Sequence, residues 1–255
     1  MSLAGKSVIV TGGAGFIGSH LTDRLIAEEP ANLVVVDNLF LGKEENLASA
    51  RERFPDLRFY REDVSDYDAM RAIVAAEAVD VVFDLAVIPL PTSLERPRWT
   101  VDVNLAMTTT MCELLREGLY KTLIHYSSSE VYGTARYEPM DESHPLLPLT
   151  PYAASKAGGD HIVASYRATF GVDVATVRPF NAFGPRQNAQ AYAGIIPTVI
   201  RRALAGEEVL IHGDGDQTRD FNYVADVADF TLRVYETPAT RGRVVNVASG
   251  KEVSV

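Results

Sequence analysis

The segment SVIVTGGAGFIG, residues 7–18, decides the fold. A short strand rich in β-branched residues runs directly into a glycine-rich turn, and a helical pattern follows from about residue 16 to residue 29. Gly12, Gly15 and Gly18 suit the three needs of such a turn, namely a tight bend, close approach of a pyrophosphate and close packing of helix on strand. Free N–H groups at the start of the helix attract phosphate. The segment therefore predicts a dinucleotide-binding strand–turn–helix unit.

Further apolar strands, separated by helix-length segments, are expected at 33–38, 57–63, 80–86, 122–128 and 172–180. Strands that are apolar on both faces and alternate with helices are typical of a parallel sheet covered on both sides. We therefore predict an α/β fold of the Rossmann type, with a doubly wound parallel sheet. The NAD-binding domain is expected to cover residues 1–180.

The sequence changes in texture after residue 180. A Gly-, Pro- and Asn-rich loop is expected first, then a helix at about 195–205, a short strand at 209–212, a second loop over 213–220 and a strand at 221–224. No linker separates these segments from the sheet. Residues 181–255 are therefore expected to form a small substrate-binding lobe interleaved with the sheet.

Composition excludes several classes of protein. The chain has 255 residues, 47% of them hydrophobic, a net charge of −10 and one cysteine. This apolar fraction argues against a disordered chain, no apolar run reaches the roughly 20 residues of a membrane span, and the N-terminal apolar stretch is too short for a signal peptide. The acidic balance disfavours nucleic acid as a partner, and the lone cysteine fits a reducing compartment. We expect a cytoplasmic protein without a metal site.

Two acidic residues at strand ends point to the cofactor. Asp37 ends the second predicted strand, where a carboxylate can accept the ribose hydroxyls of NAD and would repel the additional phosphate of NADP. NAD is therefore the expected cofactor. Asp63 ends the third predicted strand and can either meet the adenine or cap the helix that follows.

Tyr152 and Lys156 lie four residues apart at the start of a predicted helix, so both lie on one helical face. A free tyrosine has a pKa of about 10, and a neighbouring ammonium favours the phenolate. A tyrosine so tuned can remove a hydroxyl proton. The alternative is a core tyrosine beside a lysine. Ser128 ends the fifth predicted strand and can share a substrate hydrogen bond with Tyr152, or serve only in a turn.

Five motifs together resemble the extended short-chain dehydrogenase/reductase family that modifies nucleotide sugars. They occur in family order as TGGAGFIG (11–18), SSSEVYG (127–133), YAASK (152–156), RPFNAFGPR (178–186) and GDGDQTRDFNYV (213–224). The resemblance implies tightly held NAD, a UDP-sugar or other nucleotide-sugar substrate, and oxidation of the sugar at carbon 4. It also implies that Tyr152 is the base, Lys156 its tuner and ribose ligand, and Ser128 its hydroxyl partner.

The resemblance assigns the remaining site residues. Those expected to bind the cofactor are Gly12, Gly15, Phe16, Ile17, Gly18, Asp37, Asn38, Asp63, Val64, Leu85, Ala86, Asn104, Tyr152, Lys156 and Pro179. Those expected to bind the substrate are Ser128, Ser129, Asn181 and Arg219. The alternatives to substrate binding are that Asn181 only stabilises its own loop and that Arg219 forms an ion pair with Asp216 or Asp220. One departure from the family is Asp84, at a position before Leu85-Ala86 where family members often carry histidine.

The residues after Ser128 bear on the reaction that follows oxidation. Dehydratases of the family carry Asp-Glu there, whereas this chain has Ser129-Glu130, as UDP-glucuronate decarboxylases do. Decarboxylation of UDP-glucuronic acid to a UDP-4-keto-pentose or UDP-xylose is therefore the leading expectation, with Glu130 in a catalytic role. A 4-epimerase comes second, a 4,6-dehydratase third, and a non-catalytic NAD-binding scaffold last. Glu130 can also be a solvated carboxylate.

The resemblance also implies a homodimer and a substrate lobe that continues in relatives. Helices near 99–117 and 152–170 commonly pair across a dimer in this family, so a homodimer is expected. The apolar residues of the first helix serve equally well as an internal core face: Val101, Val103, Leu105, Met107, Met111, Leu114 and Leu115. Relatives continue beyond the equivalent of residue 255, so the substrate lobe is expected to be incomplete.

Overall fold

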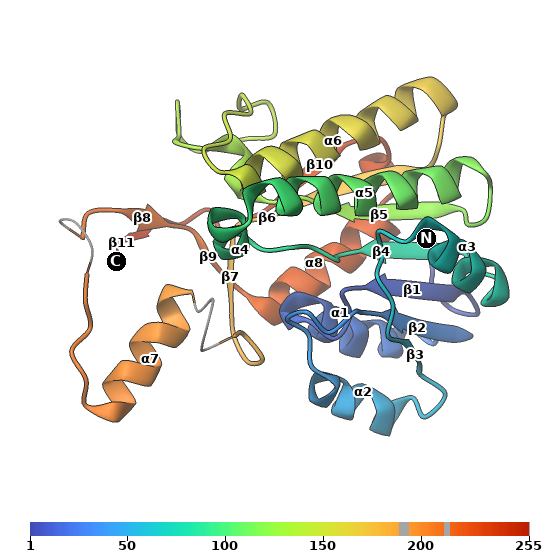
Figure 1. The fold of residues 1–255 in the computed structure, drawn as a ribbon, viewed down its shortest axis with the longest axis horizontal. Coiled ribbons are helices and arrows are strands. Elements are labelled where there is room, and N and C mark those ends of the chain that lie inside the picture. The colour runs from blue at the N-terminus through green and yellow to red at the C-terminus, as the bar shows by residue number, and fades with distance from the viewer. Residues whose placement is uncertain (189–193, 212–214, 255) are drawn as a thin grey trace.

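A seven-stranded parallel sheet forms the centre of the computed structural model, which describes residues 1–188, 194–211 and 215–254 (Figure 1). The strand order is β10-β6-β5-β4-β1-β2-β3. The strands are β1 (Ser7–Thr11), β2 (Asn32–Val36), β3 (Arg58–Tyr60), β4 (Val81–Asp84), β5 (Thr122–Tyr126), β6 (Val174–Pro179) and β10 (Val244–Val247). Every neighbouring pair is parallel. The predicted doubly wound Rossmann-type fold is confirmed.

Helices cover both faces of the sheet. Successive residues of a strand point to opposite faces, so each apolar strand contributes to two cores. Val8 and Val10 of β1 lie in one core with α1 (Phe16–Leu25), α2 (Ala48–Arg53) and α8 (Val224–Glu236). Ile9 lies in the other core with α3 (Tyr67–Ala76), α5 (Pro97–Arg116) and α6 (Pro151–Phe170). The short helix α4 (Leu90–Glu95) precedes α5. Single 3₁₀ turns complete these layers: η1 (Ile26–Glu28), η2 (Glu44–Leu47), η3 (Ser129–Tyr132) and η4 (Pro238–Thr240).

The strand order reverses between β1 and β4, which lie side by side although β2 and β3 separate them in the chain. In open α/β sheets this reversal leaves a crevice at the carboxyl ends of the strands, where ligands bind. The glycine-rich turn after β1 and the segment after β4 both end at this crevice. The fold therefore places the site.

Residues beyond 180 divide between two places. The strand β10 joins the edge of the central sheet and α8 packs against α1, whereas α7 (Ile195–Ala205) lies to one side (Figure 1). Two small sheets pair β7 (Asn181–Phe183) with β9 (Phe221–Tyr223) and β8 (Thr218–Arg219) with β11 (Val253–Ser254). The helix predicted at 195–205 and the strand at 221–224 therefore correspond to α7 and β9.

Two local predictions in this part of the chain are wrong. Residues 209–211 form no strand, and residue 212 of that predicted strand lies outside the described residues. The segments predicted as loops contain β7 and β8, which exist only because distant segments pair with them. Such pairing leaves no periodic signal in a two- or three-residue stretch.

The helices α5 and α6 lie side by side (Figure 1). On α5, Met107, Met111, Leu114 and Leu115 are buried in the internal core, whereas Val101, Val103 and Leu105 are half-buried. Val103 also packs against that core, so five of the seven apolar residues serve it, and the homodimer stays a prediction. Among the described residues, no helix is both long enough and apolar enough to cross a membrane.

Candidate active site

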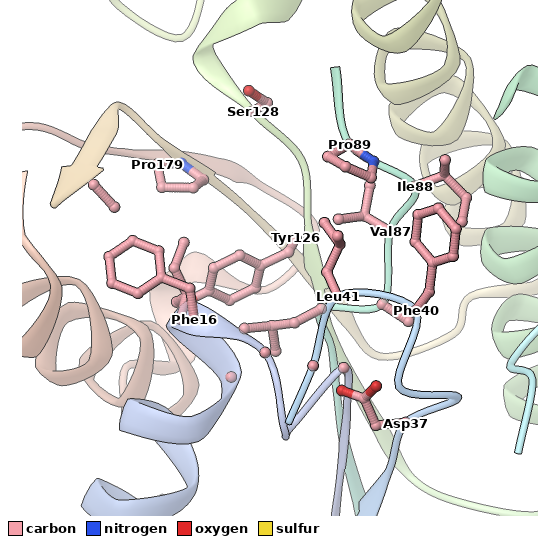
Figure 2. Close-up of a pocket in the computed structure, with 18 of the residues that line it drawn as sticks. Phe16, Asp37, Phe40, Leu41, Val87, Ile88, Pro89, Tyr126, Ser128 and Pro179 are labelled. Atoms are coloured by element: carbon pink, nitrogen blue, oxygen red, sulfur yellow. The ribbon is translucent and has the colours of Figure 1, made fainter. Parts of the chain in front are cut away.

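A pocket of about 410 Å³ follows the carboxyl ends of the strands. Figure 2 shows Asp37 at one end and Ser128 at the other, with Leu41 and Tyr126 between them. The walls come from the turn after β1 and from the segments after β2, β3, β4, β5 and β6, together with the first turns of α6. An elongated pocket of this kind suits a dinucleotide whose two ends meet different chemistry.

The turn after β1 is shaped by close backbone approaches. Gly12 has a φ of +63°, and a Cβ on it would lie 2.9 Å from the Ala86 nitrogen. A Cβ on Gly18 would lie 2.2 Å from the carbonyl oxygen of Gly12, so only glycine fits there. Gly15 precedes α1 without a side-chain cap, which leaves the helix start to a phosphate ligand. These observations fit the pyrophosphate of NAD.

Asp37 is held rigidly at one end of the pocket. Its Oδ2 accepts a hydrogen bond from the Ala14 nitrogen at 3.0 Å and its Oδ1 accepts one from the Leu39 nitrogen at 2.8 Å. Burial raises the pKa of this carboxyl, and the backbone donors act in the opposite direction. A carboxylate fixed in this way can accept the hydroxyls of a ribose and would repel a phosphate at the same place.

Asp63 also lines this end of the pocket. Its Oδ1 accepts hydrogen bonds from the nitrogen and hydroxyl of Ser65 at 2.9 and 2.7 Å, and its Oδ2 accepts one from Asn38 at 3.2 Å. Burial opposes ionisation, but these hydrogen bonds hold the pKa of Asp63 below its usual value. The N-cap of α3 is Asp66, whose carboxylate accepts from the Ala69 nitrogen, so the interpretation of Asp63 as that cap is wrong.

Tyr152 and Lys156 lie at the opposite end, in the first turns of α6. Thr150 caps this helix by accepting from the Ala153 nitrogen at 3.1 Å, and Pro151 occupies its first position, so the helix begins immediately before Tyr152. Burial raises the pKa of Tyr152 to about 12, its hydrogen bond with Ser128 acts in the opposite direction, and the charge of Glu130 raises it further. Burial lowers the pKa of Lys156, against the charges of Asp84 and Asp160.

The serine segment is shaped by η3. The Ser128 hydroxyl accepts a hydrogen bond from the Glu130 nitrogen at 3.2 Å, which starts the 3₁₀ turn and brings Ser129 and Glu130 to the pocket wall. Glu130 is exposed, as a solvated carboxylate would be, yet it lines the pocket and acts on Tyr152. Its position is therefore compatible with either interpretation made from the sequence.

The pocket brings together all but two of the site residues predicted from the sequence. Asn104 is not among the lining residues. Its side chain instead bonds the nitrogen and carbonyl of Ile88 at 2.8 and 3.1 Å and the Ser155 hydroxyl at 2.9 Å. Since Ile88 lines the pocket, Asn104 fixes the wall without touching the ligand space. The structure therefore shows Asn104 supporting the pocket wall, and its direct contact with the cofactor stays a prediction.

Arg219 lines a neighbouring cavity of about 330 Å³, which shares Asn181 with the main pocket. The Arg219 guanidinium donates to the Thr218 carbonyl at 2.7 Å, and the carboxylate of Asp220 accepts from Ser249, Gly250 and Asn222. The Asn181 amide donates to the Asp220 carbonyl at 3.3 Å, so it holds its loop and also lines both cavities.

Among the lining residues that were not predicted, Phe40 and Arg186 have contacts of note. Phe40 follows Asp37 by three residues, and its ring lies 5.7 Å from that of Trp99 at the start of α5. Arg186 lines the pocket near Asn181 and forms a 2.7 Å ion pair with Asp23 of α1. The sequence signals for these two residues were an aromatic side chain close to Asp37 and a cation in RPFNAFGPR. Neither signal reveals the contacts with Trp99 and Asp23, because both partners lie in distant segments.

Comparison with known proteins identifies the family. The family model for the NAD dependent epimerase/dehydratase family matches residues 8–248. A putative UDP-glucose 4-epimerase of Methanocaldococcus jannaschii is 36% identical, over 97% of this chain and 78% of the relative. A UDP-N-acetyl-alpha-D-glucosaminuronate decarboxylase of Bacillus cytotoxicus is 33% identical, over 98% of this chain and 77% of the relative.

The fold comparison agrees with these matches. The solved UDP-N-acetylglucosamine 4-epimerase of Methanobrevibacter ruminantium, in complex with UDP-N-acetylmuramic acid, is 37% identical with a TM-score of 0.90. The match covers 99% of this chain and 79% of that one. The resemblance inferred from the five motifs is thereby confirmed, NAD is the cofactor, and the chain belongs to the NAD dependent epimerase/dehydratase family.

Proposed function

We propose that this enzyme is a UDP-sugar 4-epimerase. The observation that carries the proposal is the continuity of one pocket from Asp37, at its cofactor end, to the hydrogen-bonded pair of Tyr152 and Ser128. The relatives named as 4-epimerases support it, and they favour the second expectation from the sequence over decarboxylation of UDP-glucuronic acid.

The proposed reaction needs few groups. NAD, held by the glycine-rich turn after β1 and by Asp37, would supply the acceptor for the carbon-4 hydride and the donor for its return. Tyr152 removes the proton of the carbon-4 hydroxyl, and Ser128 hydrogen-bonds the same oxygen. Lys156 lies one turn along α6, where its positive charge favours the phenolate over the phenol. After the 4-keto sugar has presented its other face, Tyr152 gives the proton back.

The residues around Ser128 separate epimerisation from dehydration. Elimination of water requires a base for the proton at carbon 5 and an acid for the leaving hydroxyl. Glu130 could supply one of these, but Ser129 stands where a dehydratase carries its acid. An epimerase requires neither group, which favours it over a 4,6-dehydratase.

Decarboxylation is the second candidate, because one specific observation favours it. Glu130 lines the pocket next to Ser128 and Tyr152, and the relative from Bacillus cytotoxicus is named as a decarboxylase. A 4-keto uronic acid loses carbon dioxide with the carbonyl as electron sink and needs no leaving-group acid. Under this candidate the substrate carries a carboxylate at carbon 6.

We place the diphosphate of the substrate in the cavity that Asn181 and Arg219 line. A doubly charged diphosphate approaching an acidic protein requires local donors, and a guanidinium binds such oxygens in pairs. The nucleotide therefore extends away from the sheet, toward α7. Pairing of two copies through α5 and α6 remains a prediction that size-exclusion chromatography with light scattering tests.

The test is an incubation of the purified, NAD-loaded protein with UDP-glucose, UDP-galactose, their N-acetyl counterparts and UDP-glucuronate. Proton NMR and mass spectrometry of the products then separate the candidates. An isomer of unchanged mass supports the epimerase, and loss of carbon dioxide supports the decarboxylase. Loss of water, or recovery of every substrate unchanged, contradicts the proposal.

A further inference from the structure

A row of buried polar side chains lies beneath the active site and takes no part in the reaction proposed above. Sheet pairing places Thr11 beside Asp84 and Asp84 beside His125, on three adjacent strands. The Thr11 hydroxyl donates to Asp84 Oδ1 at 2.9 Å, and His125 Nδ1 lies 3.1 Å from Asp84 Oδ2. All three side chains are buried. The Asp84 carboxylate is therefore held from two sides.

The row continues into α6. His125 Nε2 lies 4.0 Å from Asp160 Oδ1, and neither of these buried atoms has a hydrogen bond in the described structure. Gly159 packs beside this pair: a Cβ there would lie 3.2 Å from Thr108 Oγ1 and 3.4 Å from His125 Nε2. The other oxygen of Asp160 accepts from Arg178 Nε at 2.9 Å and Nη2 at 2.8 Å.

Lys156 lies next to this row. Asp160 follows it by one helical turn on α6, and Asp84 directly precedes Leu85 and Ala86 of the pocket wall. The charges of Asp84 from β4 and Asp160 from α6 act on Lys156, and Tyr152 lines the same pocket. His125 from β5 and Arg178 from β6 are the titratable groups that face these two carboxylates. Asp160 already has Arg178 as a counter-charge, whereas the hydrogen-bond donors of Asp84 are a hydroxyl and an imidazole.

We propose that Asp84 is a positioning residue for Lys156: its buried carboxylate, fixed by Thr11 and His125, is the counter-charge that keeps the Lys156 ammonium charged and in place. A buried ammonium without such a partner loses its proton readily. Burial does lower the pKa of Lys156, and the charges of Asp84 and Asp160 oppose that change. Asp84 thereby acts on Tyr152 through Lys156, without touching substrate or cofactor.

The test replaces Asp84→Asn, which keeps the shape of the side chain and removes its charge. The chain contains only five lysines, so lysine labelled with ¹³C at Cε gives a spectrum simple enough to assign by a Lys156→Arg variant. We expect the titration midpoint of Lys156 in the NAD-loaded protein to fall by about one unit or more. The alkaline limb of the kcat profile should fall with it, while KM changes by less than about twofold.

Asp80→Asn is the matched control. Asp80 directly precedes β4, and its carboxylate accepts from Lys121 Nζ at 2.6 Å and from the Ser7 nitrogen at 3.1 Å. The same charge is thus removed at the opposite end of the same strand. An unchanged Lys156 midpoint in D84N, or an equal shift in D80N, overturns the proposal. If D84N does not fold, Thr11→Val, which removes one of the two contacts that fix the Asp84 carboxylate, must lower the midpoint in its place, and an unchanged midpoint overturns the proposal.

The inference rests on the proposed role of Lys156, but the two can fail separately. The NMR titration requires no turnover, so a lowered midpoint supports the electrostatic role of Asp84 even if no nucleotide sugar is converted. Conversely, a protein that epimerises UDP-sugars but keeps its Lys156 midpoint in D84N retains the proposed function and loses the inference.

Discussion

The cofactor end of the main pocket and the neighbouring cavity beside α7 are built in different ways. At the cofactor end, the turn after β1 and Asp37 are fixed by backbone hydrogen bonds, and the strands β1 and β2 that lead into them are almost entirely buried. On the substrate side, α7 has no buried residue, and its Leu204 is 85% exposed. The contrast indicates that the sheet prepares the NAD site, whereas under the proposed function the binding of the nucleotide sugar would depend on segments with little packing of their own.

We expect the largest effect on the catalytic rate constant, kcat. Tyr152→Phe removes the proposed base and should lower kcat by about 10²–10⁴-fold while NAD stays bound. Arg219→Ala, on the substrate side, should raise KM by about tenfold or more with a smaller change in kcat, because it loses a charge-assisted hydrogen bond. Steady-state kinetics and the absorbance of retained cofactor measure both. Full activity of Y152F would remove Tyr152 from the mechanism.

The next largest effect concerns NAD affinity, and it compares a glycine-to-alanine substitution in the turn after β1 with one at the end of α7. Gly18→Ala places a Cβ 2.2 Å from the Gly12 carbonyl and should weaken NAD binding by about 100-fold or more, because the turn must open. At Gly206, which ends α7 with a φ of +69°, a Cβ meets nothing within 4 Å. Gly206→Ala should therefore cost only about 1 kcal/mol of backbone strain and leave NAD affinity unchanged. Isothermal titration with NAD decides, and equal losses would contradict the contrast.

Stability should follow the same division. Leu21 of α1 is fully buried, so Leu21→Ala is expected to cost about 2–5 kcal/mol of unfolding free energy. Leu204→Ala on α7 should change it by no more than about 0.5 kcal/mol. Urea unfolding of both variants measures the difference. A large loss for Leu204→Ala would show that α7 is covered in solution.

The smallest expected effect is a shift in the titration midpoint of Tyr152 when NAD binds. Burial raises the pKa of Tyr152 to about 12, so its phenol stays protonated below that pH in the protein without cofactor. The positive charge of the oxidised nicotinamide should lower this midpoint. Ultraviolet difference spectra of wild type against Y152F, with and without NAD, follow the phenolate. An unchanged midpoint on binding NAD would argue against direct coupling.

The sequence predicted most of what local pattern can carry. The β-branched runs and the glycine turn were sufficient for the parallel sheet, and the strand ends placed Asp37 and Ser128 at one crevice. These signals are strong because each buried strand is apolar on both faces and each glycine answers a steric need.

What the sequence could not predict depends on distant partners. The paired strands β7 and β8 are too short to show periodicity, and β10 is a half-buried edge strand. Asn104 faces the Ile88 backbone instead of the pocket, which its position on a helix does not reveal. The Asp84–His125 pair likewise arises from strand register, since the two residues lie far apart in the chain.

The most direct test of the central claim follows the hydrogen at carbon 4. UDP-galactose carrying deuterium at carbon 4 is incubated with the NAD-loaded protein in ordinary water, and the products are examined by NMR. We expect UDP-glucose that retains the deuterium at carbon 4, because the same hydride leaves and returns, and no conversion by Y152F. Recovery of unchanged UDP-galactose, or an epimer that has lost the deuterium to solvent, would contradict this expectation.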